Sequence, residues 1–220
     1  MNVSVVLPSF NRARLLPITI PTYFQEDVSE VILVDDCSSD NTAEVVKELQ
    51  TRFPTLRYFR NEVNSKQPYT QNVAISKVQS EYIYFGDDDS VLYPGSIRNL
   101  LNVMREKNAD IVGGRALALF FPEQIDELDE FLSHYRNRIA TEANQIVDLS
   151  TLSTNFTYTV KEPIRVPFCH ASCLCKTQVA REMQFDVKIE GNAYREETDF
   201  LIRATLAGYT IYYTEFGRTK

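Results

Sequence analysis

The chain has 220 residues, of which 44% are hydrophobic and 24% are charged, a composition typical of a globular protein. That length accommodates one sizeable domain, or a domain with a subdomain. The formal net charge of −7 excludes a broad basic surface, so we expect no nucleic-acid partner. The longest apolar runs have the length of a strand, so we expect no transmembrane segment.

The cysteines and the first residues of the chain indicate the cellular compartment of the protein. The chain enters a strand-like run at once, without a basic segment before an apolar one, so no signal peptide is expected. We interpret the four cysteines as reduced thiols of a cytoplasmic protein, with a peripheral place at the cytoplasmic face of a membrane left open. Cys169, Cys173 and Cys175 surround His170 but lack paired CxxC halves, which favours small buried strand residues over a zinc site.

Runs of strand length alternate with helical segments through about residue 115. We predict strands at 2–8, 30–35, 56–60, 82–85 and 111–114, and helices at 15–24, 42–52, 68–77 and 94–107. This alternation is typical of right-handed βαβ units and a mostly parallel sheet. Such sheets bind ligands beyond the carboxyl ends of their strands.

The pattern weakens between residues 116 and 168. We predict an amphipathic helix at 124–139 there, and interpret the region as an insertion or acceptor-side segment. A helix at 199–207, ended by a glycine, and a strand at 210–214 follow.

Three consecutive carboxylates, Asp87, Asp88 and Asp89, come directly after the predicted fourth strand. Their mutual repulsion needs relief by a cation or by solvent. In an extended segment Asp87 and Asp89 would point the same way, and such oxygen ligands suit Mg²⁺ or Mn²⁺. A solvated acidic turn before the next helix is the alternative interpretation.

Two further acidic pairs stand at the ends of predicted elements. Asp35 and Asp36 follow the second strand, where a carboxylate can accept hydrogen bonds from a base or ribose. Glu196 and Glu197 stand near the start of the late helix, where a carboxylate could remove a proton from an acceptor hydroxyl. Helix capping and the helix dipole are the structural alternatives for these two pairs.

Taken together and in this order, the acidic clusters resemble those of family 2 glycosyltransferases. Segments 3–12, 34–42, 85–95 and 196–209 carry the likeness, which covers residues 1–115 and 183–215. The resemblance implies the GT-A fold, an α/β three-layer sandwich with a central, mostly parallel mixed sheet. It also implies that residues 1–115 bind the nucleotide sugar, while residues 116–220 form the acceptor-side half of the same domain.

The activity that this resemblance implies is inverting transfer of a sugar from a nucleoside-diphosphate sugar, with UDP or GDP as the nucleotide. The acceptor would be a hydroxyl group of a glycan or lipid-linked glycan, and the cofactor Mn²⁺ or Mg²⁺. A nucleotidyltransferase is one alternative, although segment 8–14 lacks the glycines of a phosphate loop. A non-catalytic module that binds nucleotides or sugars is the other.

Carried over by position, the resemblance assigns individual roles. Pro8, Phe10 and Arg12 would border the nucleoside pocket, and Asp36 would bond to the base. Asp87 would lie near the ribose and the metal, and Asp89 would be the direct metal ligand. Asp88 and Asn72 would help to bind the donor. Glu197, or else Glu196, would be the general base.

The sequence also departs from the family pattern. Gln71 stands where an arginine is usual, which removes a possible pyrophosphate contact that Lys66 could replace. The chain ends before the region in which a histidine often completes the metal site, so we expect a longer natural protein.

Overall fold

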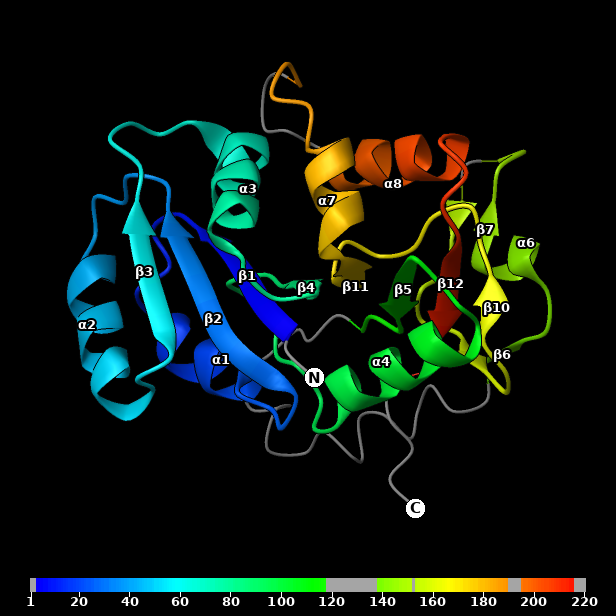
Figure 1. Ribbon diagram of the computed structural model, residues 1–220, viewed down its shortest axis with the longest axis horizontal. Helices are drawn as coiled ribbons and strands as arrows, with labels where there is room; N and C mark the ends of the chain where they lie inside the picture. The colour runs from blue at the N-terminus through cyan, green and yellow to red at the C-terminus, as the bar shows by residue number, and fades with distance from the viewer. Residues whose placement is uncertain (1–2, 118–137, 152, 190–194, 216–220) are drawn as a thin grey trace.

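The computed structural model describes residues 3–117, 138–151, 153–189 and 195–215. One sheet contains eight strands in the order β10-β12-β5-β11-β4-β1-β2-β3 (Figure 1). These strands are β1 (Val3–Ser9), β2 (Val28–Asp35), β3 (Leu56–Arg60), β4 (Tyr82–Phe85), β5 (Ile111–Gly114), β10 (Ile164–Arg165), β11 (Cys173–Lys176) and β12 (Ile211–Thr214).

Helices connect the first five strands as the alternating pattern predicts. They are α1 (Leu16–Tyr23), α2 (Thr42–Arg52), α3 (Lys66–Lys77) and α4 (Ser96–Glu106). All nine elements predicted up to residue 114 are present, each within two residues of its predicted bounds. Strand β1 pairs in parallel with both β2 and β4, and β2 pairs in parallel with β3.

The sheet is mixed because two strands run against the others. Strand β11 lies antiparallel between β4 and β5, and β10 lies antiparallel to β12, which is itself parallel to β5. Helix α7 (Thr177–Met183), which was not predicted, follows β11, and α8 (Glu196–Leu206) precedes β12. Since β11 runs backwards, its first residue lies at the edge where the parallel strands end.

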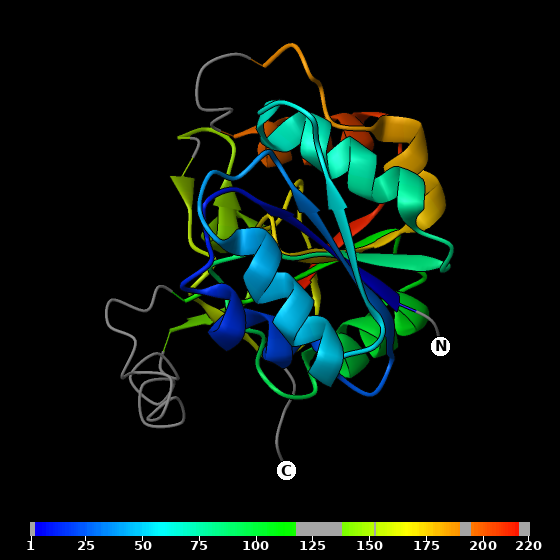
Figure 2. The ribbon, with the colours of Figure 1, turned by 90° about the vertical axis from the view of Figure 1, so that its left-hand side faces the viewer.

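Helices cover both faces of the sheet (Figure 2). Helices α1, α2 and α4 lie on one face, and α3, α7 and α8 on the other. Successive residues of a strand point to opposite faces, so Val5 and Leu7 enter the first core while Val6 enters the second. The predicted three-layer α/β architecture with a mostly parallel mixed sheet is confirmed.

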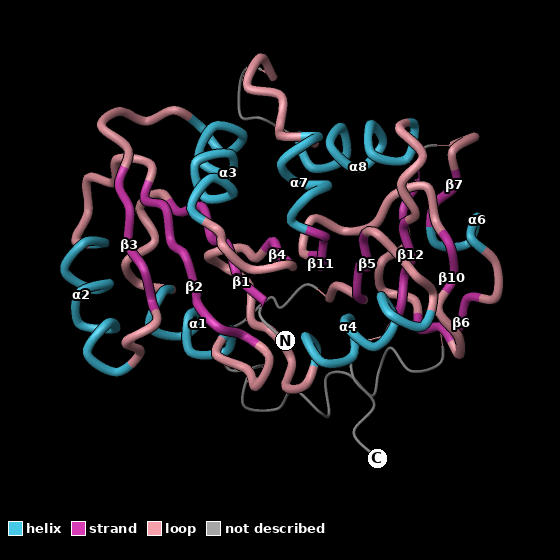
Figure 3. The backbone as a smooth tube through the Cα atoms, in the orientation of Figure 1, coloured by secondary structure: helices cyan, strands magenta, loops and turns pink. Residues whose placement is uncertain are grey.

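The described residues between β5 and β11 form short strands, a one-turn helix and loops (Figure 3). Besides β10, the described elements there are β6 (Ile139–Ala140), α6 (Ala143–Ile146), β7 (Val147–Asp148), β8 (Ser153–Thr154) and β9 (Thr159–Val160). The predicted helix at 124–139 falls outside the described residues except for its end, where Ile139 begins β6. Within the described ranges, no helix is long and apolar enough to cross a lipid bilayer.

Candidate active site

A pocket of about 310 Å³ opens where β1 and β2 end and α3 begins. Six residues predicted to bind the donor lie in its wall together with four others. The lining residues are Pro8, Ser9, Phe10, Arg12, Asp36, Asn64, Lys66, Gln67, Thr70 and Asp88. Carboxyl ends of parallel strands meet at this edge, which explains why segments far apart in sequence converge here.

Asp36 connects the end of β2 to the start of α3. Its Oδ1 accepts hydrogen bonds from Asn61 Nδ2 and Ser65 N, and its Oδ2 accepts one from Lys66 N, each at 2.8 Å. The carboxylate thus binds the first N–H groups of α3, which the helix itself leaves without partners. A carboxylate has about four acceptor positions, so the bonds made by the described residues leave one on Oδ2 for a ligand.

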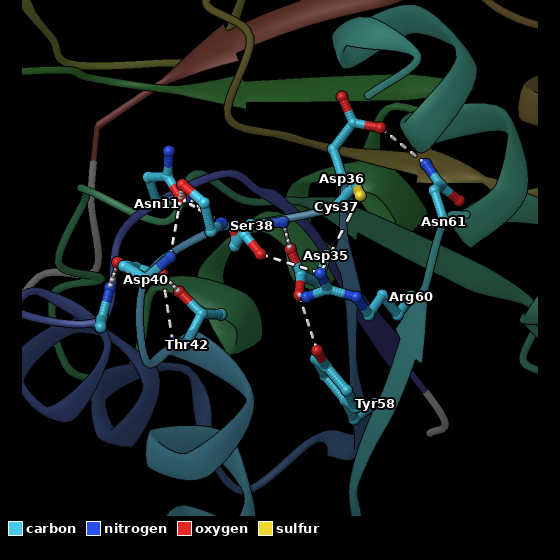
Figure 4. A network of polar contacts seen from close by, with 12 residues as sticks. Asn11, Asp35, Asp36, Cys37, Ser38, Asp40, Thr42, Tyr58, Arg60 and Asn61 are labelled. Atoms are coloured by element: carbon cyan, nitrogen blue, oxygen red, sulfur yellow. Dashed lines mark hydrogen bonds and ion pairs between the residues drawn. The ribbon is translucent and has the colours of Figure 1, made fainter. Parts of the chain in front are cut away.

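The neighbouring Asp35 points away from Asp36 and has a structural role (Figure 4). It is fully buried, and its carboxylate accepts hydrogen bonds from Tyr58 Oη at 2.6 Å, Arg60 Nη1 at 2.5 Å and Ser38 N at 2.8 Å. Consecutive residues at a strand end face opposite ways, so the two aspartates serve different surroundings.

The turns after β1 and β2 are held together by side chains (Figure 4). Asn11 N donates to Ser38 Oγ at 2.8 Å, and Asn11 Oδ1 accepts from Ser39 N at the same distance. Asp40 accepts from Ala13 N at 3.1 Å and from Thr42 N at 3.1 Å, which connects the first turn to the start of α2. These bonds determine where the β1 turn places Phe10.

The acidic segment after β4 is a turn at Asp88 and Asp89, not the extended stretch expected from the sequence. Arg12 bridges these two aspartates, with Nε 3.3 Å from Asp88 Oδ1 and Nη2 3.3 Å from Asp89 Oδ2. Asp87 instead directs Oδ2 to Ser172 Oγ, which donates to it at 2.8 Å. Glycine at position 86 lets the backbone pass close to β1, since a Cβ on Gly86 would lie 2.7 Å from Leu7 Cδ2.

Burial and charge perturb the acids of this turn. Burial raises the pKa of Asp88 to about 6, although the nearby Arg12 guanidinium lowers it. Burial also raises the pKa of Asp87, Ser172 and His170 lower it, and the charges of Asp89 and Glu197 raise it. Asp87, Asp89, Glu197 and His170 are therefore electrostatic neighbours at one edge of the sheet.

Glu196 and Glu197 form the first turn of α8. Arg195, just before them, adopts a left-handed backbone conformation with φ of 67°. Glu196 is 5% exposed, and burial, followed by the charge of Glu197, raises its pKa to about 7. Glu197 is half-buried.

The structure does not bring Asn72 to the pocket. Its amide donates to Phe185 O at 2.9 Å and accepts from Phe185 N at 2.8 Å, which joins α3 to the segment after α7. Sequence reasoning also missed two residues that hold Asp87, namely Ser172 and Tyr23. No local pattern distinguishes them, because each acts on a residue more than sixty positions away.

The donor atoms here suit a hard divalent cation that arrives with a phosphate ligand. In the part of the chain that the structure describes, no three His, Cys, Asp or Glu side chains are arranged to hold a metal ion by themselves. Mg²⁺ is commonly held by one or two carboxylates together with substrate phosphates. Asp87 and the exposed Asp89 fit that arrangement. Cys173 and Cys175 are buried in β11 as free thiols, as expected for strand residues.

Comparison with known proteins supplies the family. Residues 4–173 match the family described as Glycosyl transferase family 2. The chain belongs to this family. Its GT-A fold and its family membership were both predicted from the acidic clusters, and both are confirmed.

Two curated relatives illustrate the likeness of this family 2 chain. GalNAc(5)-diNAcBac-PP-undecaprenol beta-1,3-glucosyltransferase of Campylobacter jejuni is 33% identical over 114 residues, which cover 50% of this chain and 37% of the relative. Poly(ribitol-phosphate) beta-N-acetylglucosaminyltransferase TarP of Staphylococcus aureus is 32% identical over 121 residues, covering 51% of this chain and 36% of the relative. The chain thus spans little more than a third of the length of these relatives.

Solved structures resemble the whole described fold. Staphylococcus aureus TarS 1–349 in complex with UDP-GlcNAc matches with a TM-score of 0.65 and 17% identity, covering 100% of this chain and 60% of that one. The mannosyltransferase PcManGT from Pyrobaculum calidifontis, in complex with GDP-Man and Mn²⁺, matches with a TM-score of 0.61 and 16% identity, covering 95% and 53%. At these identities the likeness concerns the fold alone.

Proposed function

We propose that this family 2 chain is the catalytic region of a metal-dependent, inverting glycosyltransferase. It would move a sugar from a UDP- or GDP-sugar to a hydroxyl group of a glycan or lipid-linked glycan. The observation that carries the proposal is the gathering of the polar pocket, the three aspartates and the two glutamates at one edge of the sheet. The complexes of TarS with UDP-GlcNAc and of PcManGT with GDP-Man and Mn²⁺ support this donor class.

The nucleotide occupies the pocket in this proposal. The remaining acceptor position on Asp36 Oδ2 suits an N–H group of uracil or guanine, both of which present one. Phe10, 45% exposed at the pocket wall, offers an aromatic face to the base. The exposed Lys66 and Arg12 supply positive charge for the diphosphate, where Gln71 provides none.

Asp89 and Asp87 would hold the divalent cation. A bound Mn²⁺ or Mg²⁺ stabilises negative charge on a leaving diphosphate, an effect worth several kcal/mol. In its absence Arg12 offsets the charge of Asp88 and Asp89, at 3.3 Å from each. The protein thereby keeps these two adjacent carboxylates close together.

Glu197 would act as the general base. It is half-buried and shares an electrostatic environment with Asp87, whereas Glu196 is almost completely buried and less able to reach an acceptor. Removal of the acceptor proton allows its oxygen to attack the anomeric carbon opposite the nucleotide, and one such displacement inverts the configuration. General-base assistance contributes about 10²–10⁴-fold to the rate.

The two halves of the chain divide the work in this proposal. Residues 1–115 carry the pocket and the aspartates, and bind the donor. Residues 116–220 carry Glu197 and shape the acceptor side. A cytoplasmic location, in solution or at the inner face of a membrane, belongs to the same proposal and agrees with the four free cysteines.

Release of nucleoside diphosphate from a panel of UDP- and GDP-sugars, with and without Mn²⁺, tests the function. We expect slow Mn²⁺-dependent hydrolysis by the wild-type chain. Asp89→Ala should lose Mn²⁺-dependent donor binding. Glu197→Gln should bind the donor normally but turn over about 10²–10⁴-fold more slowly.

Each contrary result has a distinct meaning. Donor binding without any release, by wild type and variants alike, would favour a non-catalytic module. Full turnover by Glu197→Gln would exclude Glu197 as the base and leave Glu196 to be tested in the same way.

A further inference from the structure

The antiparallel direction of β11 brings the loop before it to the aspartates. Leu174 of β11 pairs with Tyr84 of β4, one residue before that strand ends. Because the two strands run in opposite directions, residues that precede β11 lie beside residues that follow β4. Ser172, the last residue before β11, therefore meets Asp87.

Several contacts determine the path of this loop. Cys173 pairs with Gly113 in β5, and Cys169 packs directly on the same glycine. A Cβ at Gly113 would lie 2.4 Å from Cys169 Cβ, so only glycine allows this approach. His170 Nδ1 accepts a hydrogen bond from Ser172 N at 3.1 Å, and the His170 ring meets the Phe156 ring edge-on at 5.8 Å.

Asp87 is held from two sides. Tyr23 of α1 fixes its backbone, since Tyr23 Oη donates to Asp87 O at 2.8 Å and accepts from Asp87 N at 3.2 Å. Ser172 fixes its side chain, since Ser172 Oγ donates to Asp87 Oδ2 at 2.8 Å. With the backbone held, this one bond sets the rotation of the carboxylate.

We infer that Ser172 is a positioning residue, whose hydroxyl holds the Asp87 carboxylate in the orientation that binds the divalent cation accompanying the donor diphosphate. The inference rests on the proposed function. Hydrogen bonds to a ligating carboxylate orient it, and losing such a bond typically costs 10–100-fold in metal affinity or activity. Ser172 touches no reacting atom in this role.

The affinity of the protein for Mn²⁺ tests the positioning role of Ser172 without relying on catalytic turnover. The signal of free Mn²⁺ in electron paramagnetic resonance would be followed as protein is added, in the presence of UDP and, separately, of GDP. Ser172→Ala should raise the dissociation constant of Mn²⁺ by about 10–100-fold. Ser172→Thr keeps the hydroxyl and should bind Mn²⁺ within about threefold of wild type.

A matched control is Ser76→Ala on α3. The Ser76 hydroxyl is exposed and donates to Val73 O at 2.6 Å within its own helix, so its loss should leave Mn²⁺ affinity unchanged. The melting temperature of each variant separates a local effect on the site from misfolding. We expect Ser172→Ala to melt within a few degrees of wild type.

The outcomes separate this inference from the function on which it rests. Wild-type Mn²⁺ affinity in Ser172→Ala, or equal loss in the Ala and Thr variants, would overturn the positioning role and leave the proposed function intact. A wild-type chain that binds no Mn²⁺ with either nucleotide would contradict the proposed function, and this inference with it.

Discussion

Glu196 and Glu197 are adjacent in sequence but lie in different surroundings. Glu196 is 5% exposed and its pKa is raised to about 7, first by burial and then by its neighbour's charge. Glu197 is half-buried beside Asp87. The same two-residue pattern thus gives one carboxylate that stays protonated to near neutrality and one that solvent can reach.

Replacing Glu196 by glutamine should change how stability depends on pH. Folding raises the pKa of Glu196 from 4.5 to about 7, so the folded state binds this proton more tightly than the unfolded state does. The stability contributed is fully present below about pH 4.5 and is lost as the pH rises to about 7. Glu196→Gln avoids that loss. Between about pH 4.5 and pH 7, the unfolding free energy of Glu196→Gln should therefore rise relative to that of wild type.

The gain should be on the order of 1 kcal/mol, because solvent screens the charge of a partly accessible carboxylate. Urea unfolding at a series of pH values would measure it. Glu48→Gln, at an exposed position of α2, is the control and should follow wild type. If the unfolding free energies of Glu196→Gln and wild type changed with pH in the same way, the raised pKa of Glu196 would be contradicted.

At the scale of elements, the start of α3 depends on a side chain from another strand. Ser65, at the N-cap position, makes no capping bond with its own side chain, and Lys66 has a positive φ of 70°. Asp36 of the β2 end supplies the cap through Ser65 N and Lys66 N. The pocket described above and the start of α3 therefore share one carboxylate.

Asp36→Ala should weaken folding and nucleotide binding together. Leaving buried donors without an acceptor costs about 1–3 kcal/mol, so the unfolding free energy should fall by that amount. The thermal shift produced by UDP or GDP should also be lost. The control is Asp148→Ala, whose carboxylate accepts bonds from nearby Ser150 outside the pocket. Unchanged stability with normal nucleotide binding would rule out this shared role.

At the scale of the whole molecule, an aromatic cluster joins the sheet to α8. The rings of Phe185 and Phe200 stack at 4.7 Å, and Phe85 at the end of β4 meets them edge-on at 5.5 and 5.7 Å. The cluster belongs to the core between the sheet and helices α3, α7 and α8. It therefore connects the strand that leads to the aspartates with the helix that carries both glutamates.

Phe200→Ala should lower the unfolding free energy by about 3–5 kcal/mol, since it removes a fully packed ring from this core. Leu206→Ala on the same helix should change it by less than about 0.5 kcal/mol, because Leu206 is 81% exposed. Denaturant unfolding measures both. A loss below about 1 kcal/mol for Phe200→Ala would mean that the cluster does not support α8.

Local sequence was enough to predict the alternating elements through residue 114 and the order of the acidic clusters. Hydrophobic periodicity and capping residues act within a few positions, so they can be read without knowing the fold. The carboxyl ends of parallel strands then place Asp36 and the Asp87–Asp89 turn at one edge, as expected for a sheet of this kind.

Tertiary structure alone decided the direction of β11, and with it the contact between Ser172 and Asp87. It also decided that Asn72 bonds to Phe185 and that Asp35 is structural while Asp36 faces the pocket. These outcomes depend on which distant strands pair and in which direction. No residue's neighbours in sequence carry that information, because the pairing is stabilised by hydrogen bonds and packing across the whole sheet.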